Sequence, residues 1–197
     1  EWRAAGRRRR SLLLQRASGN RAREAILLRK VAVSYERCSD YDESLRWLDE
    51  ALAVLPRRAG RLRAQVCAAT SVSLFRKGLY REAIDWGRRA LELARRSGDR
   101  RDIAYAHNML ATSYVEEGAL RRAIWHRRRA VRLYHDLGDL PGQAAANNNL
   151  GACYQLLGVL DAALYHYRVA LETDQRVGDV VDAAIVHNNI GEVLLAL

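Results

Sequence analysis

The sequence predicts an all-α protein, an α-solenoid of stacked antiparallel helix pairs, and three observations lead to this prediction. The segments that begin at Ala106, Ala146 and Val186 nearly repeat one another at a spacing of 40 residues. Small residues recur at fixed places in each repeat, and turn residues fall between the apolar stretches. A constant period of this length indicates copies of one helical unit, each burying a strip of core against its neighbours. Function should therefore lie on a surface of the stack.

The repeat extends over almost the whole chain. Equivalent alanines place repeat 1 at 25–63, repeat 2 at 64–103, repeat 3 at 104–143, repeat 4 at 144–183 and the first helix of repeat 5 at 184–197. We expect residues 1–24 to form the second helix of an earlier repeat, which gives about ten helices in one solenoid domain. Repeat arrays normally carry polar caps, and the apolar last helix lacks one, so we expect this chain to be a piece of a longer protein.

Small side chains mark the places where the two helices of a repeat cross. Positions 8, 20 and 27 are small in every repeat that contains them, and antiparallel helices pack closely only at such residues. These residues are Ala32, Ser71, Ala111, Gly151 and Gly191 at position 8, Ser44, Ala83, Ala123 and Ala163 at position 20, and Ala51, Ala90, Ala130 and Ala170 at position 27. Large apolar residues such as Leu150 and Tyr154 keep helical spacing between them.

Glycines mark the turns. Gly78, Gly118 and Gly158 are expected at the bend between the two helices of a repeat. Between repeats, a Gly is followed by Asn or Asp, which suits a left-handed residue that closes one helix and a side chain that caps the next. These pairs are Gly19-Asn20, Gly98-Asp99, Gly138-Asp139 and Gly178-Asp179.

Together these positions resemble the tetratricopeptide repeat (TPR) family, in the branch with a 40-residue period that occurs in bacterial multidomain signalling regulators. The resemblance spans residues 25–197 and implies a right-handed superhelix that binds other proteins in its concave groove. The chain departs from the family in three ways, and in one of them the proline usual at position 32 survives only as Pro56. Its period is longer than the usual 34 residues, and the usual Trp at position 4 is replaced by Leu28, Cys67, His107, Asn147 and His187.

The first helices carry the candidate binding residues. In this family, positions 2, 5, 6, 9, 12 and 13 of each first helix line the groove. Positions 5 and 6 of the later repeats hold Asn108, Asn148, Asn149, Asn188 and Asn189. An Asn amide supplies both the donor and the acceptor that an extended peptide backbone requires, and family members with Asn at position 6 use it in this way. We therefore expect these residues to grip a peptide, Asn149 and Asn189 above all.

An alternative stays open for these asparagines, because the same amides could bond to neighbouring helices and hold the repeats together. Asn147, His107 and His187 occupy the core-facing position 4, and we expect them to pack or bond inside the fold. The remaining candidate residues of the groove are Tyr105 and Phe75 for apolar contact and Arg29 and Arg76 for charge, which would favour an acidic or phosphorylated segment near repeats 1 and 2.

The net charge of +10 comes almost entirely from arginine. Most of these arginines map to the outer face of second helices, and we interpret them as a solvated surface, with nucleic-acid binding as the less favoured alternative. The outer-face arginines are Arg88, Arg89, Arg121, Arg122, Arg127, Arg128, Arg129 and Arg132.

Motifs of catalysis and of cofactor or metal binding are not found in the sequence. It has no Gly-rich phosphate loop, no paired Cys spacing and no nucleophile motif, so we expect neither an enzyme nor a cofactor. It has no signal peptide and no long apolar run, and its three cysteines are scattered, which together favour a cytoplasmic protein.

The sequence as a whole predicts a protein-protein interaction scaffold that binds a peptide segment or a partner protein in its groove. A second hypothesis is a regulatory repeat domain of a multidomain bacterial regulator, which responds to a short peptide or packs on a switch module. Self-association through the exposed terminal helices is a further expectation.

Overall fold

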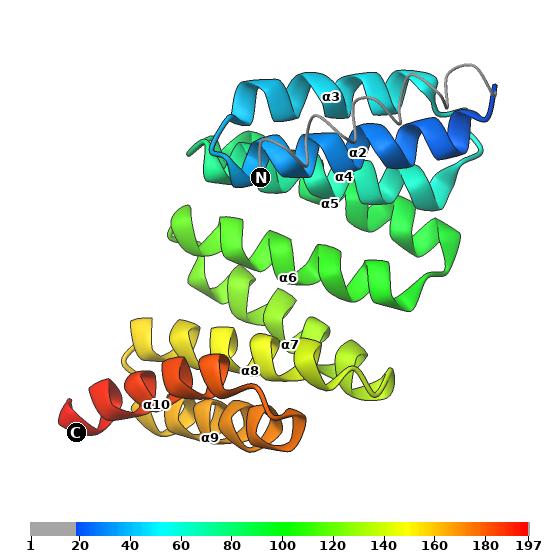
Figure 1. The fold of residues 1–197 in the computed structure, drawn as a ribbon. Coiled ribbons are helices and arrows are strands. Elements are labelled where there is room, and N and C mark those ends of the chain that lie inside the picture. The colour runs from blue at the N-terminus through cyan, green and yellow to red at the C-terminus, as the bar shows by residue number, and fades with distance from the viewer. Residues whose placement is uncertain (1–18, 197) are drawn as a thin grey trace. The chain divides into compact units, whose positions relative to one another are not determined.

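The structure is a computed structural model that describes residues 19–196 and divides into two compact units, with the boundary after Asp102. Every regular element in the described range is an α-helix, as the sequence predicts (Figure 1). The predicted second helix of an earlier repeat, at residues 1–24, lies outside the described residues except for its end. There, α2 begins at Arg21, so residues 21–24 form the first turn of α2.

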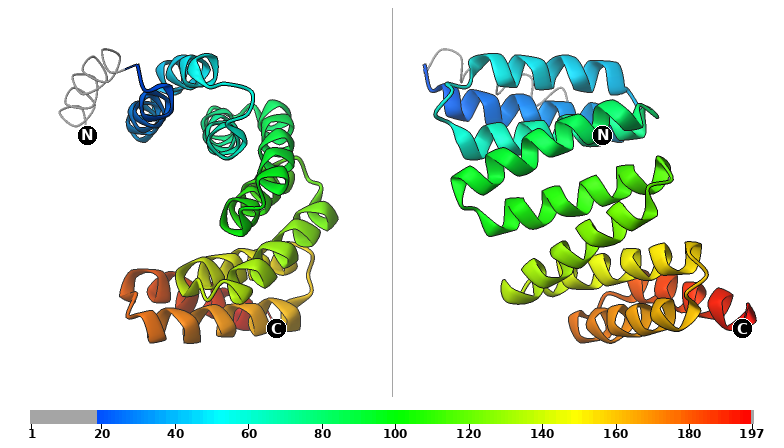
Figure 2. Two further views of the ribbon diagram at one scale, coloured as in Figure 1. Left: turned by 90° about the vertical axis from the view of Figure 1, so that its right-hand side faces the viewer. Right: turned by 180° about the vertical axis from the view of Figure 1, so that it is seen from behind.

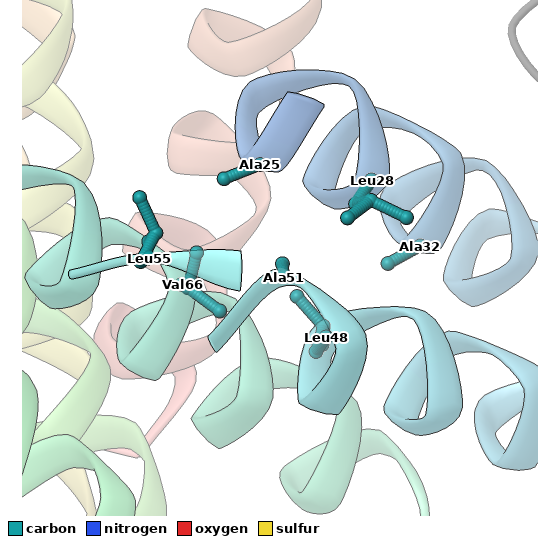
Figure 3. Packing of buried hydrophobic residues seen from close by; sticks show 7 residues of the cluster. All are labelled: Ala25, Leu28, Ala32, Leu48, Ala51, Leu55 and Val66. Atoms are coloured by element: carbon teal, nitrogen blue, oxygen red, sulfur yellow. The ribbon is translucent and has the colours of Figure 1, made fainter. Parts of the chain in front are cut away.

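The first unit contains two complete helix pairs. Helix α2 (Arg21–Arg37) packs against α3 (Tyr41–Val54), and α4 (Gly60–Arg76) packs against α5 (Tyr80–Ser97). Helix α4 also contacts both α2 and α3. Figure 3 shows the core between α2, α3 and α4, where Leu28 and Leu48 are fully buried. The labelled side chains of this cluster are Ala25, Leu28, Ala32, Leu48, Ala51, Leu55 and Val66.

The second unit contains most of α6 (Arg100–Glu116), followed by α7 (Leu120–Asp136), α8 (Leu140–Leu156), α9 (Leu160–Val177) and α10 (Val180–Leu195). Helix α8 contacts α7, α9 and α10, and α10 packs mainly against α9. Figure 2 shows α8, α9 and α10, coloured from yellow to red, as neighbouring helices. This arrangement brings the first helices of two successive repeats, α8 and α10, side by side.

The small-residue positions lie where the sequence predicts close helix packing. All residues at positions 20 and 27 are buried, and so are the first four residues at position 8. Polar members of this set bond inside the core. Ser71 Oγ donates to the Ala83 carbonyl oxygen over 2.7 Å, and the hydroxyls of Ser44 and Ser73 lie 2.9 Å apart. The predicted helix crossings are therefore confirmed.

The predicted caps are also confirmed. Asp139 and Asp179 accept hydrogen bonds from the backbone amides of Gly142 and Asp182, three residues further on. Asn20 and Asp99 bond in the same way. Each capping residue follows a glycine with positive φ, and Gly178 at φ 80° adopts the left-handed conformation that closes α9.

Candidate functional site

A cavity of about 150 Å³ lies between α8, α9 and α10 in the second unit. We call it the α8–α10 pocket. Its polar lining residues are Asn148 and Asn149 from α8, Asp174 from α9 and Asp182 from α10. Its apolar lining residues are Ala144, Ala145, Ile185 and Val186. Four of these eight residues occupy positions 2, 5 or 6 of their first helices, the positions from which the sequence predicts ligand contact.

A hydrogen bond joins two of the predicted asparagines across this site. The Asn189 side-chain amide donates to Asn148 Oδ1 over 2.9 Å and so links α10 to α8. Asn149 is half-buried and lines the same pocket. Asn188 is exposed, and its amide donates to Glu192 Oε1 one turn along α10. The structure thus brings Asn148, Asn149 and Asn189 together, whereas Asn188 bonds along its own helix.

Asn108 has a different environment. Arg127 of α7 donates through Nη1 to both the carbonyl oxygen and Oδ1 of Asn108, and through Nη2 to Thr112 Oγ1 over 2.8 Å. The Asn108 oxygens are therefore already engaged inside the helix pair. This bonding fits the alternative stated above, in which an Asn holds neighbouring helices together.

Arg127 corrects one sequence interpretation. We expected this residue on the outer face, but its side chain is buried, with only 4% of its surface exposed. The reason is its register, since position 24 of the other repeats holds Leu48, Gly87 and Tyr167, all of them buried. No acidic side chain in residues 19–196 pairs with Arg127, and its Nε atom has no hydrogen-bond partner there. Burial accordingly lowers the pKa of its guanidinium.

Of the three polar residues predicted to face the core at position 4, two are buried and the third, His187 of repeat 5, is exposed. Asn147 is buried, and its side-chain amide donates to the Gln143 carbonyl oxygen. Its Oδ1 atom lies 3.0 Å from His166 Nδ1. His107 is buried, and its Nδ1 lies 2.8 Å from His126 Nδ1. His187, however, is exposed. In the other repeats the second helix covers position 4, and within residues 19–196 no such helix packs on His187.

Asp174 is the residue of the site that the sequence analysis missed. It lies at position 31, where the other repeats hold Leu55, Ala94 and Tyr134, and all four side chains are buried. Burial and the negative charges of Asp182 and Asp179 raise the pKa of the Asp174 carboxyl. Aligning the repeats shows a carboxylate at a position that is apolar in the other three, and this departure could have identified Asp174 as a candidate site residue.

The predicted residues of the first unit form a separate group. Arg76 Nε lies 3.4 Å from Glu36 Oε1, so this cation is already paired with an acid of α2. Phe75 is half-buried and packs against Tyr80 with ring centroids 5.6 Å apart. Arg29 is half-buried. Tyr105, in the second unit, is exposed.

Several arginines of the outer face lie over aromatic rings. Arg129 lies over the ring of Trp125 at 5.3 Å and Arg128 over that of Tyr154 at 5.7 Å, while Arg122 lies 5.9 Å from the ring of Tyr114. These arginines therefore contribute packing as well as charge.

None of the helices in residues 19–196 combines the length and apolar character that crossing a bilayer requires. Within the same residues, no group of three His, Cys, Asp or Glu side chains is arranged to hold a metal ion.

The fold is that of TPR-like repeat proteins, as comparison with solved structures shows. BtubC (BKLC) from P. vanneervenii superimposes with a TM-score of 0.84 at 20% identity, over 98% of this chain and 80% of that chain. The TPR-like repeats of a putative kinesin light chain from Podosopora anserina superimpose with a TM-score of 0.75 at 13% identity, over 90% of this chain and 88% of that chain. A Rap protein complexed with competence and sporulation factor superimposes with a TM-score of 0.79 at 19% identity. The match covers 87% of this chain but only about half, 52%, of that protein.

By sequence, neither a protein-family model nor a curated relative matches this chain. The structural likeness therefore identifies the fold.

Proposed function

We propose that this chain is a protein interaction scaffold, which binds an extended peptide segment of a partner protein across α8 and α10. The observation that carries the proposal is the α8–α10 pocket, which is lined by the first helices of two successive repeats and contains the amides of Asn148 and Asn149. Amides at this spacing supply donors and acceptors for a peptide backbone, while Ala145 and Ile185 supply apolar contact.

The hydrogen bond between Asn189 and Asn148 supports the proposal in a second way. It ties α10 to α8 and holds both amides in one orientation before a ligand arrives. A site that is already ordered loses less conformational entropy on binding, so preorganisation favours affinity. The Rap protein of the same fold was solved in complex with competence and sporulation factor, which supports a binding role for this architecture.

The neutral amides and the paired Arg76 also bear on the ligand. An acidic segment was expected near repeats 1 and 2, but the Arg76 guanidinium already faces Glu36. We therefore assign the primary binding contacts to the second unit, with Asn149 and Asn189 as the central residues and Asn148 beside them. Arg29, Phe75 and Tyr105 remain proposed as additional contacts of a longer partner.

The test is selection from a random library of acetylated, amidated octapeptides on the immobilised chain, with the retained peptides read by mass spectrometry. The wild type should retain a defined family of sequences, and Asn149→Ala/Asn189→Ala should bind them roughly tenfold more weakly. This magnitude corresponds to the loss of two hydrogen bonds at about 0.5–1.5 kcal/mol each. Gln175→Ala removes an exposed amide of α9 and is the matched control. Equal retention by wild type and double variant, or no retention by either, would refute the proposal.

The regulatory hypothesis is distinguished by the shape of the bound state. A sensor should bind a selected peptide and change its radius of gyration in solution scattering, whereas a scaffold should bind without such a change. Both outcomes are compatible with the proposed peptide site. They differ in whether peptide binding changes the conformation of the rest of the chain.

A further inference from the structure

The register of the repeats makes Asp174 exceptional. Position 31 lies near the end of each second helix, or directly after it in repeat 1, and is filled by the buried residues Leu55, Ala94 and Tyr134 in repeats 1, 2 and 3. In repeat 4 a carboxylate takes this place, and only 4% of the Asp174 surface is exposed. The side chain is largely enclosed while its carboxylate borders the α8–α10 pocket, and the surrounding protein disfavours its charge. Departures of this kind from an otherwise consistent pattern are expected at functional sites.

Asp174 has no protein group to compensate its charge. Within residues 19–196, its carboxylate has no ion pair and no hydrogen bond, and no Lys or Arg lines the α8–α10 pocket. The neighbouring charged groups are acids. Asp182 lines the same pocket from α10, and the Asp179 carboxylate caps α10 by accepting from the Asp182 backbone amide. The pocket is therefore locally negative in a chain whose net charge is +10.

The rest of the lining fits an amphipathic cation. Ala144, Ala145, Ile185 and Val186 form apolar walls beside the two carboxylates. The side chains of Lys and Arg have this same character, with an aliphatic stem that packs on apolar surface and a charged head. A volume of about 150 Å³ is equivalent to roughly five water molecules, which is room for a cationic head with part of its stem.

We propose that the α8–α10 pocket binds a cationic group of the bound segment, an ammonium or a guanidinium, with Asp174 as its counter-ion at the base of the pocket and Asp182 at its rim. This inference rests on the proposed function, since it names the chemistry that the same site recognises. The Asn148 and Asn149 amides hold the backbone of the segment, and the two acids select a basic residue or a free amino terminus beside it.

The raised pKa of Asp174 fits this arrangement. The carboxyl of Asp174 has a pKa above its ordinary value because burial and the neighbouring acids disfavour the ionised form. A ligand cation would lower this pKa, because an opposite charge within the pocket favours the ionised carboxylate and offsets the neighbouring acids.

Three octapeptide libraries test the inference on the full chain. The first is acetylated and amidated and contains every residue type, the second lacks Lys and Arg, and the third lacks Lys and Arg but has a free amino terminus. The wild type should enrich Lys or Arg at one fixed place in the first library. Retention from the third library but not the second would assign the cation to the peptide amino terminus instead, and would equally support the pocket.

Matched variants make the test specific to Asp174. Asp174→Asn keeps the shape and removes the charge, and we expect it to bind the selected cationic peptides at least fivefold more weakly. Replacing the selected Lys by norleucine should weaken binding to the wild type but not to Asp174→Asn. Glu172→Gln makes the same charge change at an exposed site of α9 and should behave as wild type. If Asp174→Asn does not fold, as judged by circular dichroism, Asp182→Asn serves in its place.

The outcomes separate this inference from the proposed function. Selected peptides that depend on Asn149 but show no cationic preference in any library would overturn the cation site and leave the peptide site standing. A cationic preference that persists in both acid variants would overturn it as well. If no peptide is retained at all, the proposed function fails and this inference fails with it.

Discussion

The ring of Tyr167 on α9 lies against the backbone of Gly151 on α8. A Cβ atom added at residue 151 would lie 2.7 Å from Tyr167 Cδ1, which is closer than packed carbon atoms approach. Tyr167 is almost fully buried, and its hydroxyl donates to Gln155 Oε1 over 2.7 Å, so the ring cannot easily move aside. In repeat 1 the same two positions, 8 and 24, hold Ala32 and Leu48. A larger side chain in one helix is therefore matched by a smaller one in its partner.

This relationship predicts that Gly151→Ala destabilises the chain. Overpacking a tight core typically costs about 1–3 kcal/mol, which outweighs the gain of about 0.5–1 kcal/mol for replacing Gly by Ala in a helix. Urea unfolding measures the difference. Gly191→Ala is the control, because no heavy atom lies within 4 Å of the added Cβ at that position. It should leave stability unchanged or raise it.

A double-mutant cycle tests the cause. In the Tyr167→Leu background, which copies the Leu48 of repeat 1, Gly151→Ala should no longer cost stability. An unchanged cost in that background would show that the ring of Tyr167 is not what excludes a side chain at residue 151.

Arg127→Ala should lower the free energy of unfolding by roughly 2–4 kcal/mol, because it removes a large buried side chain together with its bonds to Asn108 and Thr112. Arg132→Ala on the same helix removes an exposed arginine and should change stability by no more than about 0.5 kcal/mol. Both values follow from urea unfolding curves. Equal effects of the two substitutions would contradict the buried placement of Arg127.

Asp174→Asn should stabilise the chain near neutral pH. The folded-state pKa of Asp174 is raised above 3.8, so the folded chain binds this proton at pH values where the unfolded chain has released it. The free energy of unfolding therefore falls as pH rises from about 3.8 through the folded-state pKa. Asparagine does not titrate, so the difference in free energy of unfolding between the variant and the wild type should grow with pH over this window. Below the window this difference should be smallest and constant.

Unfolding curves at several pH values measure this difference. Glu172→Gln, two residues away and exposed, is the matched control and should show no such growth with pH. A difference between Asp174→Asn and wild type that does not vary with pH would contradict an unpaired, buried carboxylate at this position.

The arginines over aromatic rings on α7 should not contribute to peptide binding. Arg128→Gln/Arg129→Gln removes two positive charges from the outer face, and affinity for the selected peptides should stay within twofold of wild type. Binding to a single-stranded RNA should fall steeply with salt in the wild type, as for any polyanion on a basic surface. Fluorescence anisotropy measures both affinities. Tight RNA binding at moderate salt that the double variant loses would favour the nucleic-acid hypothesis instead.

Much of the fold could be predicted because it repeats. Small residues such as Ala83 and Ala123 recur at one position, and a recurring position identifies a helix crossing without any knowledge of the contacts. The caps at Asp139 and Asp179 follow from local sequence for the same reason, since a capping side chain bonds only a few residues away.

The site could be predicted in part. Groove positions located Asn148, Asn149 and Asn189 on adjacent first helices, but helical spacing could not distinguish their environments from that of Asn108, which bonds to a buried arginine. The charge of that arginine predicts a surface position, whereas its register at position 24, shared with Leu48 and Tyr167, predicts burial. Asp174 was missed in the same way, since a lone acid among many charged residues is noticeable only when the repeats are aligned.

The most direct test of the account is where a selected peptide binds. Titration of the isotope-labelled chain with that peptide should shift the side-chain amide signals of Asn148, Asn149 and Asn189, together with the methyl signals of Ile185 and Val186. The Nε signals of Arg128 and Arg129 should stay in place. Shifts confined to those arginines, with the asparagine amides unmoved, would contradict binding across α8 and α10.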